Sequence, residues 1–218
     1  MNPAKSSVSK SLRNLATSTL ANALDRVGFH TQTFVNLKPV KPGMAFAGPA
    51  ITVQQETGPF GTFQSEDFKV GAMIDAAQPG DVIVVAADAA PYSTWGGMAS
   101  LAAKTKGLAG IAIDGGARDA NETSDAGFSV FSRHLVPTTG RCRLRVTDIG
   151  GTVVADGVTV EAGDWIVGDD TGILSIPKTV VDEVITLAGQ FTIEDEKAAD
   201  AIRNGMSFSD AMKQFGNI

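Results

Sequence analysis

The stretch DGGARDANE places a cation and a carboxylate, Arg118 and Asp119, side by side after the apolar run LAGIAI. This pattern predicts a buried strand ended by a paired glycine turn, and strand ends in α/β sheets are where small ligands usually bind. A guanidinium suits a planar carboxylate or a developing oxyanion, and a carboxylate suits a hard divalent cation. Together with Asp114, the pair predicts a metal-assisted site for a keto acid.

A second interpretation of the same residues needs no ligand. In it, Asp119 caps the helix that ANETSDAG predicts, and Arg118 pairs with a neighbouring side chain. Both interpretations stay open on spacing alone.

The stretch GGMAS after Trp95 provides another candidate site. The amides of Met98 and Ala99 are expected at a helix start, where N–H groups without partners and the helix dipole attract an anion such as a substrate carboxylate. The alternative is that Gly96 and Gly97 only let the loop turn. The two candidate sites strengthen each other if the fold brings them together.

Other catalytic motifs are missing from the sequence. There is no GxGxxG or GxxxxGK[ST] fingerprint for a nucleotide and no GxSxG elbow for a serine nucleophile. His30 and His134 belong to no HxH or HExxH pattern, so we expect no zinc site. Cys142 falls in the alternating run CRLRV, a predicted strand, which argues against an acyl-enzyme.

The composition bounds the class of protein. The chain has 218 residues, of which 43% are hydrophobic, so it can bury one sizeable core, and we expect one compact domain. The formal net charge of −6, without a run of basic residues, argues against a surface for nucleic acid. Because the longest apolar runs are too short to span a bilayer, we expect a cytoplasmic protein with no membrane partner.

The elements that would position these residues alternate between helix and strand in the first part of the chain. Helical spacing in TSTLANALDRVG predicts a helix capped by Ser18 or Thr19 and ended by Gly28. PAITVQ, PGDVIVVAA and LAGIAID predict strands, the last two of them buried. Further helices are expected at 65–77 and in the run that ends at Gly107.

The second part of the chain is richer in strands. From FSVFSRHLVP onward, short alternating runs separated by glycines predict a curled antiparallel sheet. The helical period returns from Lys178 to about Asn204, and a last helix is expected near Ser209. These patterns indicate a layered α/β domain with a C-terminal helical extension from about residue 178.

Several stretches resemble the RraA-like family, which includes the 4-hydroxy-4-methyl-2-oxoglutarate/4-carboxy-4-hydroxy-2-oxoadipate aldolases. The most specific is WGGMASLAAKTKGLAGIAIDGGARDANE, and TSTLANALDRVG, AGPAITVQ, AAQPGDVIVV and VEAGDWIVGDDTGILSIP extend the likeness over most of the chain. The resemblance implies one RraA-like domain over residues 1–218, a layered β/β/α sandwich of the swivelling-domain type. It also implies a homotrimer or hexamer with active sites between neighbouring subunits.

The resemblance also assigns roles to the candidate residues. In the family's aldolases the arginine of the Arg-Asp pair contacts the keto-acid oxygen and the aspartate helps to hold Mg²⁺ or Mn²⁺, which matches Arg118 and Asp119. The loop at Gly97, Met98 and Ala99 is then expected to bind the pyruvyl carboxylate through its amides.

The resemblance implies two further acidic residues in the metal site, and this chain has a match for one of them but not for the other. An acidic residue near the C-terminal helix of the next subunit completes it, and Glu196 is the best match, with Glu194 as the alternative. The aldolases carry a further Asp where this chain has Gly97. Because a hard cation needs oxygen ligands, the absence of this Asp carboxylate should weaken metal binding or make other oxygen atoms the ligands. The candidate replacements are water, Asp114, Glu66 and Asp67.

We therefore expect a divalent-metal-dependent lyase that acts on a small 2-oxo acid. It would cleave a 4-hydroxy-2-oxo acid with release of pyruvate, decarboxylate oxaloacetate, or both, with Arg118 stabilising the enolate and Asp119 holding the metal. The alternatives are a non-catalytic RraA-like regulator that binds a protein partner, and a ring that binds a carboxylate without turnover. A menaquinone methyltransferase, a name that family members also carry, is rejected because the sequence has no nucleotide fingerprint.

Overall fold

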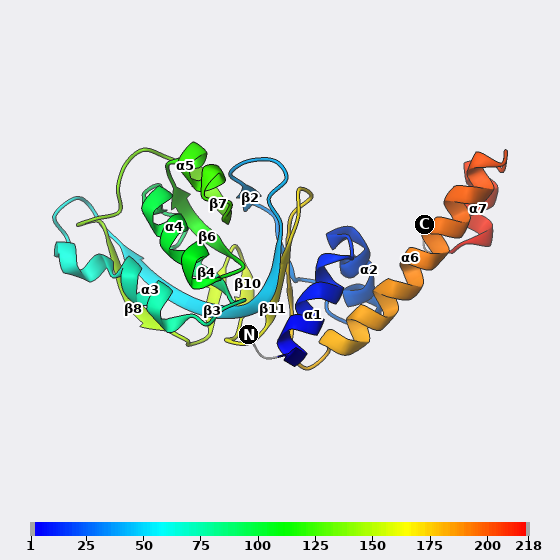
Figure 1. The fold of residues 1–218 in the computed structure, drawn as a ribbon, viewed down its shortest axis with the longest axis horizontal. Helices are drawn as coiled ribbons and strands as arrows, with labels where there is room; N and C mark the ends of the chain where they lie inside the picture. Colours follow the sequence, from blue (N-terminus) through cyan, green and yellow to red (C-terminus); the bar gives the residue numbers. More distant parts are fainter. Residues whose placement is uncertain (1–2, 217–218) are drawn as a thin grey trace.

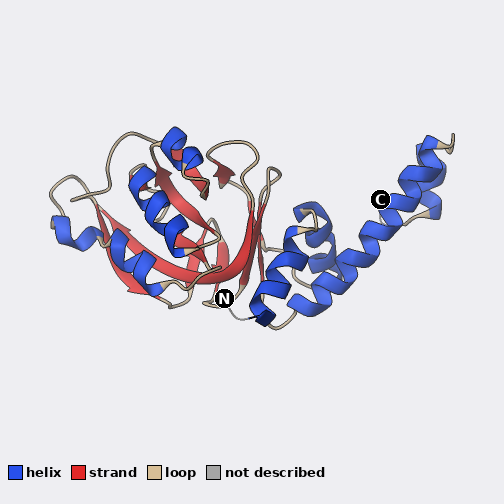
Figure 2. Ribbon diagram, viewed as in Figure 1, coloured by secondary structure: helices blue, strands red, loops and turns tan. Residues whose placement is uncertain are grey.

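The computed structural model describes residues 3–216, which form a curled sheet, helices within its curve and a helical arm at one end (Figures 1 and 2). The strands are β1 (Thr33–Phe34), β2 (Lys38–Pro39), β3 (Phe46–Thr57), β4 (Val82–Ala86), β5 (Ser93–Trp95), β6 (Gly110–Ala117), β7 (Ser129–Leu135), β8 (Leu144–Ile149), β9 (Val153–Ala155), β10 (Val158–Val160), β11 (Trp165–Gly168) and β12 (Ile173–Ile176). The helices are α1 (Pro3–Arg13), α2 (Thr17–Arg26), the 3₁₀ turn η1 (Ser65–Phe68), α3 (Val70–Ala76), α4 (Gly97–Lys106), α5 (Ala120–Asp125), α6 (Val181–Arg203) and α7 (Phe208–Gln214). Within these residues, ten strands form one sheet in the order β1-β12-β11-β3-β4-β6-β7-β2, with β5 beside β6 and β8 beside β3.

Four parallel strands, β3, β4, β6 and β7, form the centre of the sheet. Ile51 of β3 lies beside Ile83 of β4, which lies beside Ile111 of β6. Every residue of β4 and β6 is buried, as parallel strands covered on both faces require. The strands predicted from the apolar runs VIVVAA and LAGIAI are therefore confirmed.

The paired glycines of DGGA do not form the predicted turn. Strand β6 continues through them to Ala117, because Gly116 pairs with His134 of β7 and Ala117 with Leu135. A Cβ at Gly116 would lie 2.6 Å from the carbonyl oxygen of Tyr92, so glycine at this position allows a close approach of two backbone segments. The Arg118–Asp119 pair therefore follows directly after the last residue of the strand.

Helix α2 begins two or three residues earlier than expected, and the partner of its first amide comes from a distant part of the chain. Its N-cap is Ala16, so the predicted cap at Ser18 or Thr19 is wrong. The carboxylate of Asp169, which follows β11, accepts hydrogen bonds from the Thr17 amide (3.0 Å) and hydroxyl (2.7 Å) instead. The predicted end of the helix at Gly28 agrees with the structure.

Two further local predictions are wrong. The single helix expected at 65–77 is split into η1 and α3, because Lys69 between them adopts a left-handed backbone conformation (φ 42°). Cys142 lies in a turn before β8, with φ of 62°, rather than in a strand. The segments around Lys69 and Cys142 both border the candidate site.

The buried side chains of the described chain form two apolar clusters. The larger one unites the sheet with α3 and α4, and the second packs α1, α2 and the first half of α6 against β11 and β12. The rest of α6 and α7 extends away as an arm (Figure 1). This mixed α/β architecture with a curled sheet confirms the predicted fold class.

Helices α6 and α7 agree with the helices expected from Lys178 to about Asn204 and near Ser209, and the C-terminal extension from about residue 178 stays a prediction. The single domain expected over residues 1–218 stays a prediction. Among the described helices, none is both long enough and apolar enough to cross a membrane.

Candidate functional site

The Arg118–Asp119 pair links the end of β6 to the start of α5. The Arg118 amide donates to the Trp95 carbonyl of β5 (2.9 Å), and Asp119 takes up the left-handed conformation (φ 55°) that Asp tolerates better than most residues. Oδ2 of Asp119 lies 3.5 Å from Nε of Arg118 and accepts a hydrogen bond from the Gly97 amide (3.2 Å). Asp119 is the N-cap residue of α5, as the interpretation without a ligand predicted, but its side chain makes no capping hydrogen bond to the helix. The pairing of Arg118 with a neighbour is confirmed.

Gly96 brings the turn between β5 and α4 close to this pair. Its backbone is extended (φ −155°), so it is space rather than conformation that requires glycine. A Cβ at Gly96 would lie 2.5 Å from Oδ2 of Asp119 and 3.2 Å from Cγ of Arg118. Gly96 therefore has a packing role beyond letting the loop turn.

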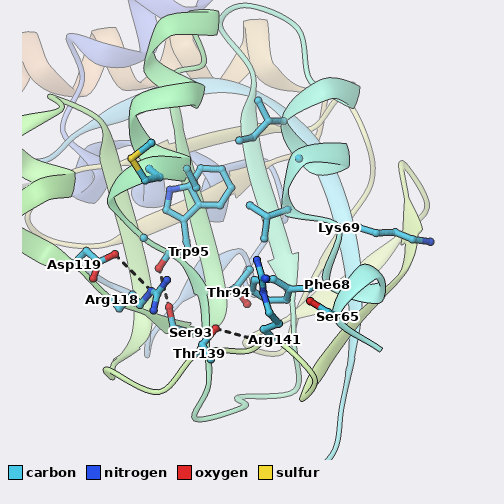
Figure 3. A pocket seen from close by; sticks show the side chains of 16 residues that line it. Ser65, Phe68, Lys69, Ser93, Thr94, Trp95, Arg118, Asp119, Thr139 and Arg141 are labelled. Atoms are coloured by element: carbon cyan, nitrogen blue, oxygen red, sulfur yellow. Dashed lines mark hydrogen bonds and ion pairs between the residues drawn. The ribbon is translucent and has the colours of Figure 1, made fainter. Parts of the chain in front are cut away.

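The two candidate motifs meet in one cavity of about 430 Å³ (Figure 3). Met98 and Ala99 of α4 line it together with Arg118 and Asp119. The rest of the lining consists of Ser65, Phe68, Lys69, Val70, Gly71, Ile74, Ser93, Thr94, Trp95, Gly96, Thr139 and Arg141. This lining carries two arginines and a lysine against one carboxylate, which favours an anionic ligand.

A buried hydrogen-bond network holds β5, α4 and α5 together beside the cavity. Nε1 of Trp95 donates to Oγ of Ser100 (3.0 Å), and that oxygen lies 3.1 Å from Oγ1 of Thr123. Trp95 is 2% exposed and its ring stacks on Phe128, with centroids 6.0 Å apart. Because an unpaired buried polar group costs about 1–3 kcal/mol, this network fixes the start of α4 relative to α5.

The start of α4 lies in the wall of the cavity. The first N–H groups of a helix have no partner within the helix, and Met98 and Ala99 occupy this position in the lining. Gly97 borders a neighbouring hollow of about 510 Å³ that Glu122 also lines. A Cβ at Gly97 would lie 2.7 Å from Cβ of Glu122, so an Asp at this position would require movement of α5.

Asp114 belongs to a buried ion-pair network and does not line the cavity, contrary to the expectation for it. Arg133 donates to Asp114 (2.6 Å) and to Asp156 (2.5 Å), and the Asp156 amide donates to Asp114 (2.7 Å). Burial alone would raise the pKa of Asp156, but hydrogen bonds from Asn36 and Arg133 hold that pKa below its ordinary value. Burial lowers the pKa of Arg133, but the carboxylates of Asp114 and Asp156 raise it by more, so this pKa lies above its ordinary value.

The other acidic candidates lie apart from Asp119 within one chain. Glu66 and Asp67 belong to η1, but neither lines the cavity. Glu194 and Glu196 stand on α6, toward the arm that extends away from the sheet (Figure 1). The expected contribution of Glu196 therefore requires a second subunit and stays a prediction.

The possible metal ligands of one chain fit a magnesium site completed by water and substrate better than a site built from protein ligands alone. Among the described residues, no three His, Cys, Asp or Glu side chains come together as metal ligands. Mg²⁺ usually keeps several waters and binds through one or two carboxylates and the substrate. Asp119 fits such a cation as the carboxylate that this chain provides, with water and substrate oxygens completing the shell.

Four further residues of the cavity lining carried no motif in the sequence. Ser93 and Thr94 of β5, Phe68 of η1 and Arg141 of the turn before β8 line the cavity as well. The spacing of Arg141 with two further arginines in RCRLR was the available signal. Which of these arginines lines the cavity depends on which face of this segment is turned toward β5.

Comparisons with known proteins agree with this architecture. The profile of the RraA-like family, described as Aldolase/RraA, matches residues 17–175. An uncharacterised protein of Methanocaldococcus jannaschii is 33% identical over 180 residues, which are 81% of this chain and 82% of that protein. A protein of Halalkalibacterium halodurans with the provisional name of a 4-hydroxy-4-methyl-2-oxoglutarate aldolase is 30% identical over 195 residues, 89% of this chain and 88% of its own.

A solved structure extends the likeness to the fold. Streptomyces coelicolor RraAS2, described as an unusual member of the RNase ES inhibitor RraA protein family, matches with a TM-score of 0.77 and 26% identity, over 90% of this chain and 98% of that one. The region matched by the family profile contains both motifs of the cavity, at 97–99 and 118–119. The chain therefore belongs to the RraA-like family.

Proposed function

We propose that the protein is a cytoplasmic, divalent-metal-dependent lyase that releases pyruvate from a 4-hydroxy-2-oxo acid, from oxaloacetate, or from both. The observation that supports this most is that Arg118, Asp119 and the first residues of α4, Met98 and Ala99, line one cavity with a cationic lining. The provisional aldolase name of the Halalkalibacterium halodurans relative agrees with the proposal.

In this proposal the chain's residues divide the work on a 2-oxo acid. The amides of Met98 and Ala99 bind its carboxylate, helped by the partial positive charge at the start of α4. Arg118 stabilises negative charge on the 2-oxo oxygen as the enolate of pyruvate forms. Asp119 orients the guanidinium and holds Mg²⁺ or Mn²⁺, which when bound supplies Lewis acidity at the reacting carbonyl group.

The remaining carboxylate is proposed to come from a second subunit of a homotrimer or hexamer. Glu196 is exposed on α6, and Glu194 is the alternative on the same helix. The arm around them exposes apolar side chains, Ile193 (53%), Phe208 (62%) and Met212 (52%), which suits a surface covered by another subunit. A carboxylate in this place would position the water that removes the proton of the C4 hydroxyl group.

Pyruvate release tests the proposal directly. Protein freed of metal with a chelator is incubated with oxaloacetate or 4-hydroxy-4-methyl-2-oxoglutarate, with and without Mg²⁺ or Mn²⁺. We expect metal-dependent pyruvate release that is lost in Arg118→Ala. No pyruvate from either substrate would overturn the proposal for these compounds.

A non-catalytic role is the second candidate. RraAS2, to which the fold is similar, is described within a family of RNase inhibitors, and Gly97 replaces an Asp of the family's aldolases. For a regulator that binds a protein, Arg118→Ala should leave the binding surface intact. For a ring that only binds carboxylates, the ligand should raise the unfolding temperature without any release of pyruvate.

A further inference from the structure

One wall of the cavity is a helical segment with a break in the middle. The segment 65–74, the lid, lines the cavity through Ser65, Phe68, Lys69, Val70, Gly71 and Ile74. Figure 3 shows Ser65 and Phe68 across the cavity from Arg118. We infer that the lid opens when Lys69 turns right-handed and joins η1 and α3 into one helix, and closes over the ligand when Lys69 turns left-handed. The inference rests on the proposed function, since it takes the cavity as the place where the 2-oxo acid binds.

Two backbone conformations of Lys69 compete at the break. Lys69 has φ of 42° and ψ of 34°, a left-handed conformation that is sterically costly for a residue with a Cβ atom. A right-handed Lys69 would continue α3 back through η1, as the sequence pattern over 65–77 predicts. The amides of Val70, Gly71 and Ala72, which begin α3, would then gain carbonyl partners within the helix. The joined helix is therefore the conformation that the local sequence favours.

The Phe68 ring holds η1 in the closed form. Within η1, where no residue is fully buried, Phe68 is partly buried and packs against the larger apolar cluster. Gly140 leaves room for the ring, because a Cβ there would lie 2.8 Å from Cε2 of Phe68. This contact opposes the cost of the left-handed Lys69. A ligand that contacts the closed lid therefore shifts the balance between the two forms.

Both ends of the lid are attached to the rest of the protein. Before η1, the Gly61 amide donates to the Cys142 carbonyl of the turn before β8 (3.0 Å). At the end of α3, Nζ of Lys106 donates to the carbonyls of Ile74 and Asp75 (2.8 Å each). The conformational change is thereby confined to the residues between these two attachments, so the sheet and α4 keep their places.

Three substitutions of Lys69 shift this balance in different directions and remove the same charge. Lys69→Gly favours the closed form, because glycine adopts the left-handed conformation without steric cost, whereas the β-branched Lys69→Val disfavours it. Lys69→Ala keeps the balance of the wild type and is the matched control for the lost ammonium group. Hydrogen exchange of the free protein, measured by mass spectrometry, follows the amides of 70–72. We expect these amides to exchange at least about threefold more slowly in Lys69→Val than in Lys69→Gly, since the joined helix pairs them.

Binding of pyruvate in the presence of Mn²⁺ tests whether the lid acts on the cavity. Isothermal titration should show that Lys69→Val binds pyruvate at least about threefold more weakly than Lys69→Gly, with Lys69→Ala between them. Equal exchange at 70–72 in all three variants, or equal affinities despite different exchange, overturns the inference. If pyruvate binds neither to the variants nor to the wild type, the proposed function fails, and the exchange rates alone decide whether the lid has two forms.

Discussion

Arg118 offers the sharpest test at the scale of single residues, because its proposed role needs the shape of a guanidinium as well as its charge. Arg118→Lys keeps the charge but loses the planar pair of donors, so we expect kcat for pyruvate release to fall by at least about a hundredfold. The side chain is 45% exposed, so the unfolding temperature should change little. Steady-state kinetics measure the effect, and a loss below threefold would show that the guanidinium geometry is not used.

Gly97 gives a prediction about stability. Gly97→Asp places a Cβ 2.7 Å from Cβ of Glu122, and this overpacking should cost about 1–3 kcal/mol of the free energy of unfolding. The matched control is Gly189→Asp within α6, where a Cβ would meet no atom within 4 Å.

Denaturant unfolding of both variants checks the argument. Combining Gly97→Asp with Glu122→Ala leaves the clashing Cβ in place, whereas Glu122→Gly removes it and should recover most of the loss. Equal stability of Gly97→Asp and the wild type would mean that α5 moves freely.

The sequence predicted the central residues of the candidate site for a local reason. Arg118 and Met98 each lie just beyond the end of a strand, and β5 and β6 are neighbours, so both arrive at one place. The cap on Thr17 could not be predicted in this way, because its partner Asp169 lies 152 residues away in the chain. Arg141 was missed because backbone hydrogen bonds of Thr138 and Gly140 with Ser93 of β5, which the local pattern does not predict, bring its segment to the cavity.

At the scale of elements, Ser100 joins β5 to α4 and α5. Ser100→Ala leaves the indole N–H of Trp95 and the hydroxyl of Thr123 without this partner in a buried place, which should cost about 1–3 kcal/mol. Thr105→Ala is the control, since that exposed hydroxyl bonds only to the Leu101 carbonyl of the same helix. Chemical denaturation measures both, and equal effects of the two substitutions would argue against the network.

The spacing of apolar residues predicted those helices and strands whose apolar side chains pack in the core. Strands β3, β4 and β6 and helices α4 and α6 lie close to their expected positions, because their apolar faces meet the core. The break at Lys69 was not predicted, since it depends on a left-handed backbone conformation at a lysine, where no glycine marks the end of η1. The pairing of Gly116 with β7 likewise overrode the local preference for a turn.

At the scale of the whole molecule, Asp169 joins the N-terminal helices to the turn between β11 and β12. Burial raises its pKa, but hydrogen bonds from Thr17 and from the amides of Thr171 and Gly172 hold the pKa below its ordinary value of 3.8. A carboxylate with a lowered folded-state pKa contributes its full stabilisation above the ordinary pKa and loses it as the pH falls through the folded value. We therefore expect the free energy of unfolding to fall below about pH 4.

Asp169→Asn should remove part of this acid sensitivity. Its free energy of unfolding should be about 1–2 kcal/mol lower at neutral pH and should approach that of the wild type in acid. Urea unfolding at several pH values measures both curves, with the exposed Asp75→Asn as the control. Parallel curves for Asp169→Asn and the wild type would contradict the role given to Asp169.

The pairing of distant strands has a consequence for the growing chain. Strand β1 pairs with β12, and the first half of β3 pairs with β11, more than a hundred residues later. Contacts of such separation form slowly, and an unpaired strand edge is a template for aggregation. During translation the edge at 46–49 therefore stays open until β11 has left the ribosome, so the yield of active protein depends on how well a nascent chain is protected during that interval.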